Sequence, residues 1–232
     1  MKKLLILLIT VASLSSCEKS VEFNNPGFQG FINGTVWKAN ASQAAKGAVG
    51  TTTIKITGTS ASGLMEFNLN STALGKRVLG ISGAPNFVAY SSLTDNPSFK
   101  YTTNNAAGPV NNLTLSSGGT GYTTASLVPT TGGSGSGLKV DFVANSAGGI
   151  SEITVNAPGT RYIAGDVVTV TGGGANATFV VQNTANSNGE ITITEFKDGT
   201  ISGNFKFVAF DALATPKTAV CRDGVFYKIP LN

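Results

Sequence analysis

Residues 158–174 read "PGTRYIAGDVVTVTGGG", and residues 118–134 read "GGTGYTTASLVPTTGGS". Both stretches have a threonine two residues before a tyrosine, followed by a short apolar run and a glycine cluster. The similarity extends in both directions at an offset of 40 residues, with one residue deleted after the glycine cluster. Each copy predicts about three short strands separated by glycine turns. A unit of about 40 residues cannot easily bury both sides of three strands by itself. We therefore expect the two copies to pack against each other.

The segments on either side of the repeats predict strands almost throughout. "GFQGFINGTVWKA" (27–39) places Asn33-Gly34 between two alternating arms, which predicts a hairpin with a type I′ turn. "TTTIKITG" and "GLMEFNLN" alternate with period two, and "NFVAY" and "SFKYT" alternate more weakly. The strand pattern continues after residue 190, with turns predicted at Asp198-Gly199 and Asp223-Gly224. Only "SQAAK" and "TALGKR" could form a helical turn.

We therefore expect an all-β fold: an antiparallel β-sandwich or partly open barrel with an inserted second β module of two repeats of about 40 residues. The β domain is expected at 27–105 and 190–232, and the glycine-rich insert at 106–189. "SFKYTT" and "EITITEF" are predicted to form one hairpin with the insert at its tip, so that deletion of 107–188 leaves a folded domain. The predicted core face comprises Phe31, Trp37, Ile54, Ile56, Phe67, Leu69, Ile191, Ile193, Phe205, Phe207 and Phe226.

The N-terminal residues predict export. Lys2 and Lys3 precede an apolar run from Leu4 to Leu14, and "LSSC" ends at Cys17. This order predicts a signal peptide at 1–16, because the run is too short for a membrane span. The ending resembles the lipobox of bacterial lipoproteins, which implies that Cys17 receives a diacylglyceryl group and that residues 17–26 form a tether to the membrane. The alternative is an ordinary secretory signal with an incidental cysteine.

Composition excludes several function classes. The sequence has no histidine, which removes His-based catalytic triads and most zinc and copper sites, and we expect neither a metal nor a cofactor. Without Lys2 and Lys3 the chain has 14 basic and 12 acidic residues, with no basic stripe, so nucleic acid is not an expected partner. Cys221 lies in an apolar run and is predicted to be a buried thiol.

Two tyrosines are the candidate ligand-binding residues. Tyr122 and Tyr162 occupy equivalent positions in the two repeats, and Arg161 precedes the second. The rings could serve as platforms for a glycan or peptide, or each could cover a glycine turn of its own repeat. Asp166 is expected to form an Asx turn, because one carboxylate cannot supply the six to eight oxygens of a calcium site.

Two resemblances can be named on these residues. "FINGTVWKA", "ITITEFKDGTISGNFKFVAFDA" and "GVFYKIPL" resemble an uncharacterised all-β domain of small Bacteroidota lipoproteins, over roughly residues 25–105 and 190–232. That resemblance implies export and lipidation but no chemistry. The second repeat is similar to glycine-rich "GSGYxxGDxxTxxGGG" repeats of phage structural proteins and bacterial surface proteins, although the first repeat lacks the Gly-Asp step.

The sequence as a whole favours a non-enzymatic binding or adhesion module of the cell envelope. The protein is expected to be lipid-anchored at the outer membrane through Cys17, on either the periplasmic or the cell-surface face, with a glycan or an envelope protein as its partner. A structural component of an envelope assembly is the first alternative. A polysaccharide-acting enzyme is the second, disfavoured because nothing pairs Glu190, Glu195 or Asp198 across a cleft.

Overall fold

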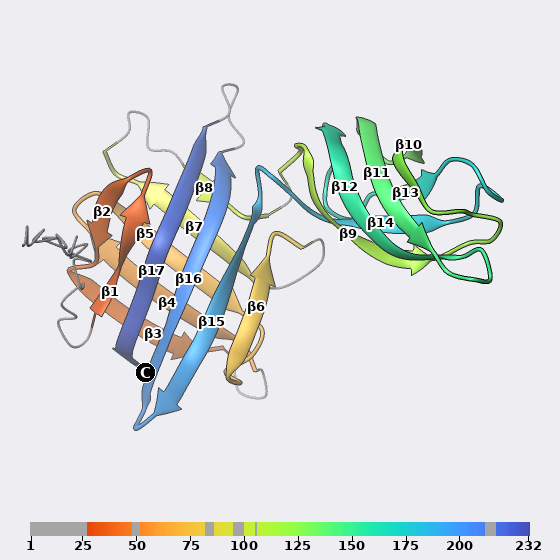
Figure 1. The fold of residues 1–232 in the computed structure, drawn as a ribbon. Coiled ribbons are helices and arrows are strands. Elements are labelled where there is room, and N and C mark those ends of the chain that lie inside the picture. The colour runs from red at the N-terminus through yellow and green to blue at the C-terminus, as the bar shows by residue number, and fades with distance from the viewer. Residues whose placement is uncertain (1–26, 48–51, 82–85, 95–99, 105, 212–216) are drawn as a thin grey trace, which may run out of the picture.

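The computed structural model describes residues 27–47, 52–81, 86–94, 100–104, 106–211 and 217–232. The signal peptide, Cys17 and the tether lie outside these residues. Every described strand pairing is antiparallel, apart from one isolated parallel bridge, and the strands form one sheet of eleven and one of six (Figure 1). The larger sheet is a half-barrel and the smaller a nearly closed barrel, so the expected all-β class is confirmed. Among the described residues, no helix is long and apolar enough to cross a membrane.

The eleven-stranded sheet, called the half-barrel below, is built from the two ends of the described chain. Its path runs β2-β1-β17-β16-β8-β7-β5-β4-β3, and β15 and β6 extend it from β16. Its strands are β1 (Gly27–Ile32), β2 (Thr35–Lys38), β3 (Ala41–Lys46), β4 (Ile54–Ser60), β5 (Gly63–Leu69), β6 (Gly75–Leu79), β7 (Phe87–Ser92), β8 (Lys100–Thr102), β15 (Asn188–Lys197), β16 (Thr200–Asp211) and β17 (Thr218–Pro230).

Two of the predicted turns are confirmed, and the third is a bulge. Asn33 and Gly34 both have positive φ, 50° and 82°, and they join β1 to β2 as a type I′ turn requires. The Asp198-Gly199 pair joins β15 to β16 in the same way. Asp223 also has positive φ, but it lies inside the continuous strand β17, where two residues, Asp223 and Gly224, lie opposite the single residue Gly30 of β1.

Neither of the two segments that could form a helical turn does so. "SQAAK" lies in β3, which pairs with β4 from Ala41 opposite Thr59 to Lys46 opposite Ile54. "TALGKR" leads into β6, which pairs with β15. Both segments are too short to nucleate a helix alone, and a neighbouring strand that supplies a complete ladder overrides their weak preference.

The half-barrel core is an aromatic cluster. Phe28 lies within 5.2–6.3 Å, centroid to centroid, of four other rings, those of Trp37, Phe67, Phe205 and Phe226. All predicted core residues are buried except Phe31, which is only half-buried. Phe28 and Phe31 are three residues apart on β1 and therefore face opposite sides of the sheet. The prediction of Phe31 as a core residue is therefore wrong, because Phe28 occupies the core.

The six-stranded sheet, called the repeat barrel below, contains the two repeats. Its strand order is β12-β11-β10-β13-β14-β9, so the first strand of each repeat pairs with the third strand of the other. The pair Val140 and Val155 in one half corresponds to Phe179 and Leu115 in the other. The two copies have thus exchanged their first strands. The strands are β9 (Val110–Ser117), β10 (Ala125–Gly132), β11 (Ser136–Ala144), β12 (Ile150–Thr160), β13 (Val167–Val170) and β14 (Thr178–Thr184).

The repeat barrel interrupts a single strand of the half-barrel. Thr102 at the end of β8 pairs with Phe210 of β16, and Asn188 at the start of β15 pairs with Val208 of the same strand. The two strands therefore follow one another along one edge of β16, and the Ser187 hydroxyl donates a hydrogen bond to the Thr103 carbonyl between them. The predicted hairpin of "SFKYTT" and "EITITEF" is wrong, because β8 and β15 lie end to end instead of side by side.

Candidate functional site

A cleft of about 220 Å³ opens at one end of the half-barrel. It lies where the β1–β2 turn, the β4–β5 turn and the end of β7 come together. Its walls combine three aromatic side chains with hydroxyl and amide groups, and none of the described residues that line it is charged. The lining residues are Ile32, Asn33, Thr35, Val36, Trp37, Ser62, Tyr90, Ser92, Thr94, Tyr101 and Ala219.

The aromatic wall of the cleft is held in place by strand pairing and hydrogen bonds. Tyr90 and Tyr101 are directly opposite on β7 and β8, and their rings stack at 5.9 Å between centroids. The Tyr90 hydroxyl donates to the Ser62 carbonyl at 3.4 Å, and Trp37 Nε1 donates to the Gly63 carbonyl at 3.4 Å. A Cβ on Gly63 would lie 2.7 Å from the Tyr90 ring, so only glycine fits there.

Hydroxyl groups line the rest of the opening. Ser92 Oγ and Thr94 Oγ1 are 3.3 Å apart, and Ser62 Oγ lies 3.0 Å from Ser60 Oγ. A hydroxyl both donates and accepts hydrogen bonds, so such a rim suits ligands that also carry hydroxyl or amide groups. The cleft offers no carboxylate or other base beside a hydroxyl among its described lining residues, and activation of a nucleophile needs one.

The two tyrosines predicted as ligand platforms are buried in the repeat barrel. Tyr122 is 4 % exposed and Tyr162 is 1 % exposed. A Cβ on Gly173 would lie 2.8 Å from the Tyr122 ring, and one on Gly135 would lie 2.5 Å from the Tyr162 ring. Each ring therefore covers glycine loops from close range, and neither presents an open face to a ligand.

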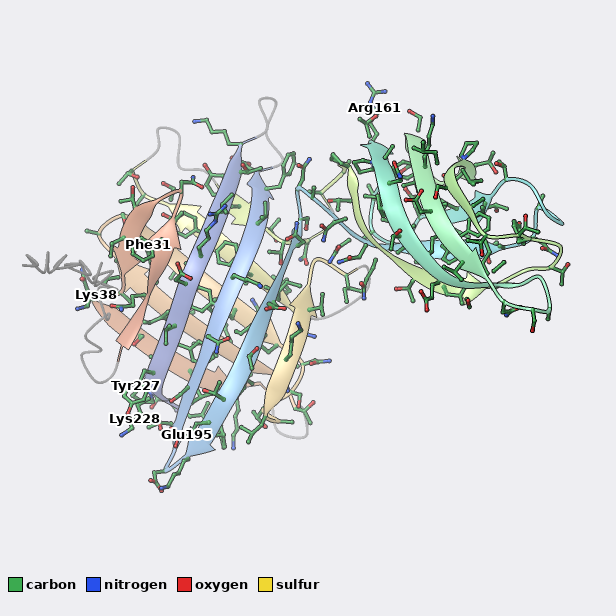
Figure 2. The ribbon with its side chains drawn as sticks, in the orientation of Figure 1. Phe31, Lys38, Arg161, Glu195, Tyr227 and Lys228 are labelled. Atoms are coloured by element: carbon green, nitrogen blue, oxygen red, sulfur yellow. The ribbon has the colours of Figure 1, made fainter. Side chains whose placement is uncertain are left out.

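The Tyr122 hydroxyl also joins the two repeats. It donates to the Val170 carbonyl at 3.0 Å and accepts the backbone N–H groups of Asn176 and Ala177, both at 3.1 Å. Arg161, by contrast, is exposed, and its side chain extends away from the barrel (Figure 2). The structure does not bring Arg161 together with the tyrosines into one site.

Asp166 closes a loop between the repeats and does not form the predicted Asx turn. Its Oδ2 accepts hydrogen bonds from Ser134 Oγ at 2.6 Å, from the Ser134 N–H at 3.1 Å and from the Ile163 N–H at 2.9 Å. Burial acts to raise the pKa of this carboxyl, but the hydrogen bonds outweigh it and hold the pKa below its usual value. The carboxylate is thus a structural acceptor.

Glu190 and Cys221, the other side chains with potential chemistry, are held in ion pairs and in the core, respectively. Glu190 forms ion pairs with Lys76 at 2.6 Å and Lys206 at 3.1 Å, and hydrogen bonds from these lysines lower its pKa, whereas a glycosidase acid needs a raised one. Cys221 is buried, and burial together with the charge of Asp223 raises the pKa of its thiol to about 12. Within the described residues, no three Cys, Asp or Glu side chains gather into a group that could hold a metal ion.

The cleft is not evident in the sequence, because its residues come from distant segments. Trp37 was assigned to the core, and Tyr90 and Tyr101 were noted only within weakly alternating strands. The available signal was small: two tyrosines eleven residues apart in segments predicted to be strands. Nothing in that spacing shows that the two rings stack or that Trp37 faces them.

The comparisons with known proteins identify a family. Residues 24–126 and 150–230 match the family described as "Domain of unknown function (DUF6252)", and because the match covers most of the chain, the chain belongs to this family. The match enters the repeat barrel from both sides and omits 127–149, so it extends beyond the segments in which the resemblance was recognised. No curated protein and no solved structure matches the chain.

Proposed function

We propose that this member of the DUF6252 family is a lipid-anchored protein of the cell envelope that binds a neutral, hydroxyl-rich ligand, such as a sugar unit of a glycan, in the cleft of the half-barrel. The observation that carries the proposal is the composition of the cleft: a rim of hydroxyl and amide groups, and no charged side chain among the described lining residues. The three aromatic side chains in the lining are themselves only 2–6 % exposed, so they support the rim and offer little ring surface of their own. Sugars carry many hydroxyl groups, which can hydrogen-bond to such a rim.

The size of the cleft limits the ligand. Sites for drug-sized molecules occupy roughly 300–1,000 Å³, and this cleft has about 220 Å³. It therefore accommodates a single ring-sized group, such as a terminal or branching sugar, with the rest of a longer chain outside. We expect weak binding by one site, strengthened when several anchored copies meet a repetitive ligand.

The anchoring part of the proposal rests on the N-terminal sequence. "LSSC" after a basic start and an apolar run resembles a lipobox, and the flanking segments resemble Bacteroidota lipoproteins. Processing there would leave Cys17 as a lipidated N-terminus at the outer membrane. Intact mass of the mature protein tests this step, and protease treatment of whole cells distinguishes the cell-surface face from the periplasmic face.

The binding part is tested on the chain from Cys17 onward with an array of envelope glycans, followed by calorimetry on each glycan that binds. Thr35→Lys places a charge at the rim of the cleft, where Thr35 is exposed. The matched control is Thr131→Lys, at an exposed position of the repeat barrel. We expect Thr35→Lys to abolish binding and Thr131→Lys to leave it unchanged. Equal binding by both variants, or no bound glycan at all, would refute the assignment.

A second candidate function is a structural role in an envelope assembly. Among the described strands of the half-barrel, β2, β3 and β6 each pair with one neighbouring strand, so each presents an open edge. At β6 the Arg77 side chain donates to the carbonyls of Gly75 and Ala73, which partly closes that edge. Concentration-dependent assembly in analytical ultracentrifugation would favour this role, and a monomer at all concentrations would favour the cleft.

A further inference from the structure

Two lysines lie over aromatic rings at the end of the half-barrel opposite the cleft. Lys46 Nζ is 5.9 Å from the centroid of the Phe196 ring, and Lys228 Nζ is 5.3 Å from the centroid of the Tyr227 ring. Phe196 is 39 % exposed, although it is a large apolar side chain. These four residues are called the lysine–aromatic end below.

Strand register places the four residues at one end. Phe196 pairs with Ile201, and Ile201 pairs with Ile229, so Phe196 and the last residues of β17 lie in one row across three strands. Ala44 of β3 bridges to Leu231, which brings Lys46 to the same end of the half-barrel. Figure 2 shows Tyr227 and Lys228 near Glu195 at the end where β17 finishes, with Phe31 farther along the sheet.

The backbone fixes Lys228 in this position. Lys228 has positive φ, 48°, which is uncommon for a residue with a side chain, and its N–H donates to Ser202 Oγ at 3.0 Å. Ser202 Oγ in turn lies 3.5 Å from a carboxylate oxygen of Glu195. A hollow of about 450 Å³ opens beside Lys46, with the apolar side chains of Leu69 and Phe87 in its lining. The end is therefore amphipathic, with apolar surface beneath basic groups.

The described chain begins at this same end. Gly27 pairs with Tyr227, and the tether that precedes it, residues 17–26, is ten residues long. Ten residues reach no more than about 35 Å even when fully extended. If Cys17 carries a lipid, as the proposed function holds, this end is therefore the part of the half-barrel that the tether holds nearest to the bilayer.

We infer that the lysine–aromatic end docks on the headgroup region of a phospholipid bilayer. Aromatic rings settle at the boundary between hydrocarbon and headgroups, and lysine stems extend along apolar surface while the ammonium groups reach phosphates. Lys46, Lys197 and Lys228 are offset at this end by Glu195 and Asp198, so the charges nearly cancel. Docking then depends more on Phe196 and Tyr227 than on anionic lipid.

Docking in this orientation has a consequence for the cleft. Tyr101 and Ala219, which line the cleft, lie toward the opposite ends of their sheet from Phe196 and Tyr227. The cleft therefore opens away from the bilayer, toward ligands that arrive from outside the membrane. The inference rests on the proposed anchoring, and the test below separates the two.

The test uses the chain from Cys17 onward, coupled through its Cys17 thiol to a maleimide lipid in vesicles. Cys221 does not compete, because it is buried. Lysine acetylation is then measured residue by residue by mass spectrometry, for tethered protein and for untethered protein mixed with the same vesicles. We expect acetylation of Lys46 and Lys228 to slow roughly threefold or more on tethering. The exposed Lys100 and Lys139 should be unchanged.

Phe196→Ser tests the aromatic contribution, with Leu93→Ser as the matched control at another exposed apolar residue. Protection of Lys46 and Lys228 should fall in the first variant and persist in the second, on phosphatidylcholine vesicles as well as on vesicles containing phosphatidylglycerol. Equal acetylation with and without the tether would overturn the inference, and so would protection confined to phosphatidylglycerol vesicles. Because the maleimide link replaces the natural lipid, absence of lipidation in cells would refute the anchoring alone.

Discussion

Removal of residues 104–187, with Thr103 joined directly to Asn188, should leave the half-barrel folded. Thr102 pairs with Phe210 and Asn188 pairs with Val208, so Ala209 is the only residue of β16 between them and Thr103 is left to face it. The joined strand therefore keeps its register along β16. Tyr101, Thr103, Ile191 and Ile193 also keep a common core-facing side, because their alternation continues across the join.

The expected change in stability is small. Closing an unstructured loop of this length would cost about 4 kcal/mol of stability. The folded repeat barrel already holds its own two ends together, so the intact protein pays less than this cost. The deletion therefore gains less than this amount by removing the loop. The excision removes the hydrogen bond from Ser187 to the Thr103 carbonyl, which contributes about 1 kcal/mol. We expect the free energy of unfolding of the half-barrel to stay within about 2 kcal/mol of its value in the intact chain.

The control is a deletion one residue shorter, 105–187, which retains Asn104. A slip of one residue would turn Ile191 and Ile193 from the core to the outer face. Both are buried at 0–1 % exposure, and exposing them would cost roughly 1.5–3 kcal/mol each. The in-register deletion should therefore be clearly the more stable of the two.

Urea unfolding followed by tryptophan fluorescence measures both deletions. Trp37 is the single tryptophan of the sequence and is buried in the half-barrel, so it reports on that unit alone. Equal midpoints for the two deletions would refute the argument from register. A broad, non-cooperative transition of the in-register deletion would show that the half-barrel depends on the repeat barrel.

Three further predictions concern single groups. Tyr122→Phe removes a hydroxyl that satisfies one carbonyl and two N–H groups, so the free energy of unfolding of the repeat barrel should fall by about 1–3 kcal/mol. The unfolding transition reported by Trp37 should stay unchanged. An unchanged unfolding temperature of the repeat barrel in calorimetry would contradict this prediction. The pKa of Asp166 is lowered in the folded state. Its contribution to stability is therefore fully present above the pKa of the unfolded state, about 3.9, and is lost as pH falls through the lower pKa of the folded state. The urea midpoint of the repeat barrel should therefore fall on acidification, with a smaller dependence in Asp166→Asn, and identical pH profiles would exclude this role. Cys221, with its thiol pKa raised to about 12, should resist a thiol reagent at pH 8 in the folded protein and react fully in urea; rapid labelling without denaturant would refute its burial.

Much of the secondary structure could be predicted from short-range patterns. Period-two alternation located β4 and β5, and Asn33-Gly34 and Asp198-Gly199 located two hairpin turns. The pattern fails where local signals conflict with pairing: it predicts Phe31 in the core, which Phe28 occupies instead, and it predicts a turn at Asp223-Gly224 although β17 continues through it. A strand that is paired on both sides can retain a bulge at a point where an isolated segment would turn.

The candidate site could be predicted far less well. The repeated Tyr122 and Tyr162 attracted attention because they recur, but recurrence here reflects the need to cover glycine loops. The cleft residues Trp37, Tyr90 and Tyr101 carry no shared motif, and they meet only because β7 pairs with β8 and the half-barrel curls around them.

The sequence by itself determined the all-β class, the main hairpin turns and the 40-residue repeat, because these follow from side-chain alternation and backbone preferences within a few residues. Only the tertiary structure decided that the repeats exchange their first strands, that β8 and β15 follow one another along β16, and that the cleft lies opposite the lysine–aromatic end. These features depend on which strand edges pair across long stretches of chain. Hydrogen-bond ladders and core packing select those pairings from many that the local pattern allows equally.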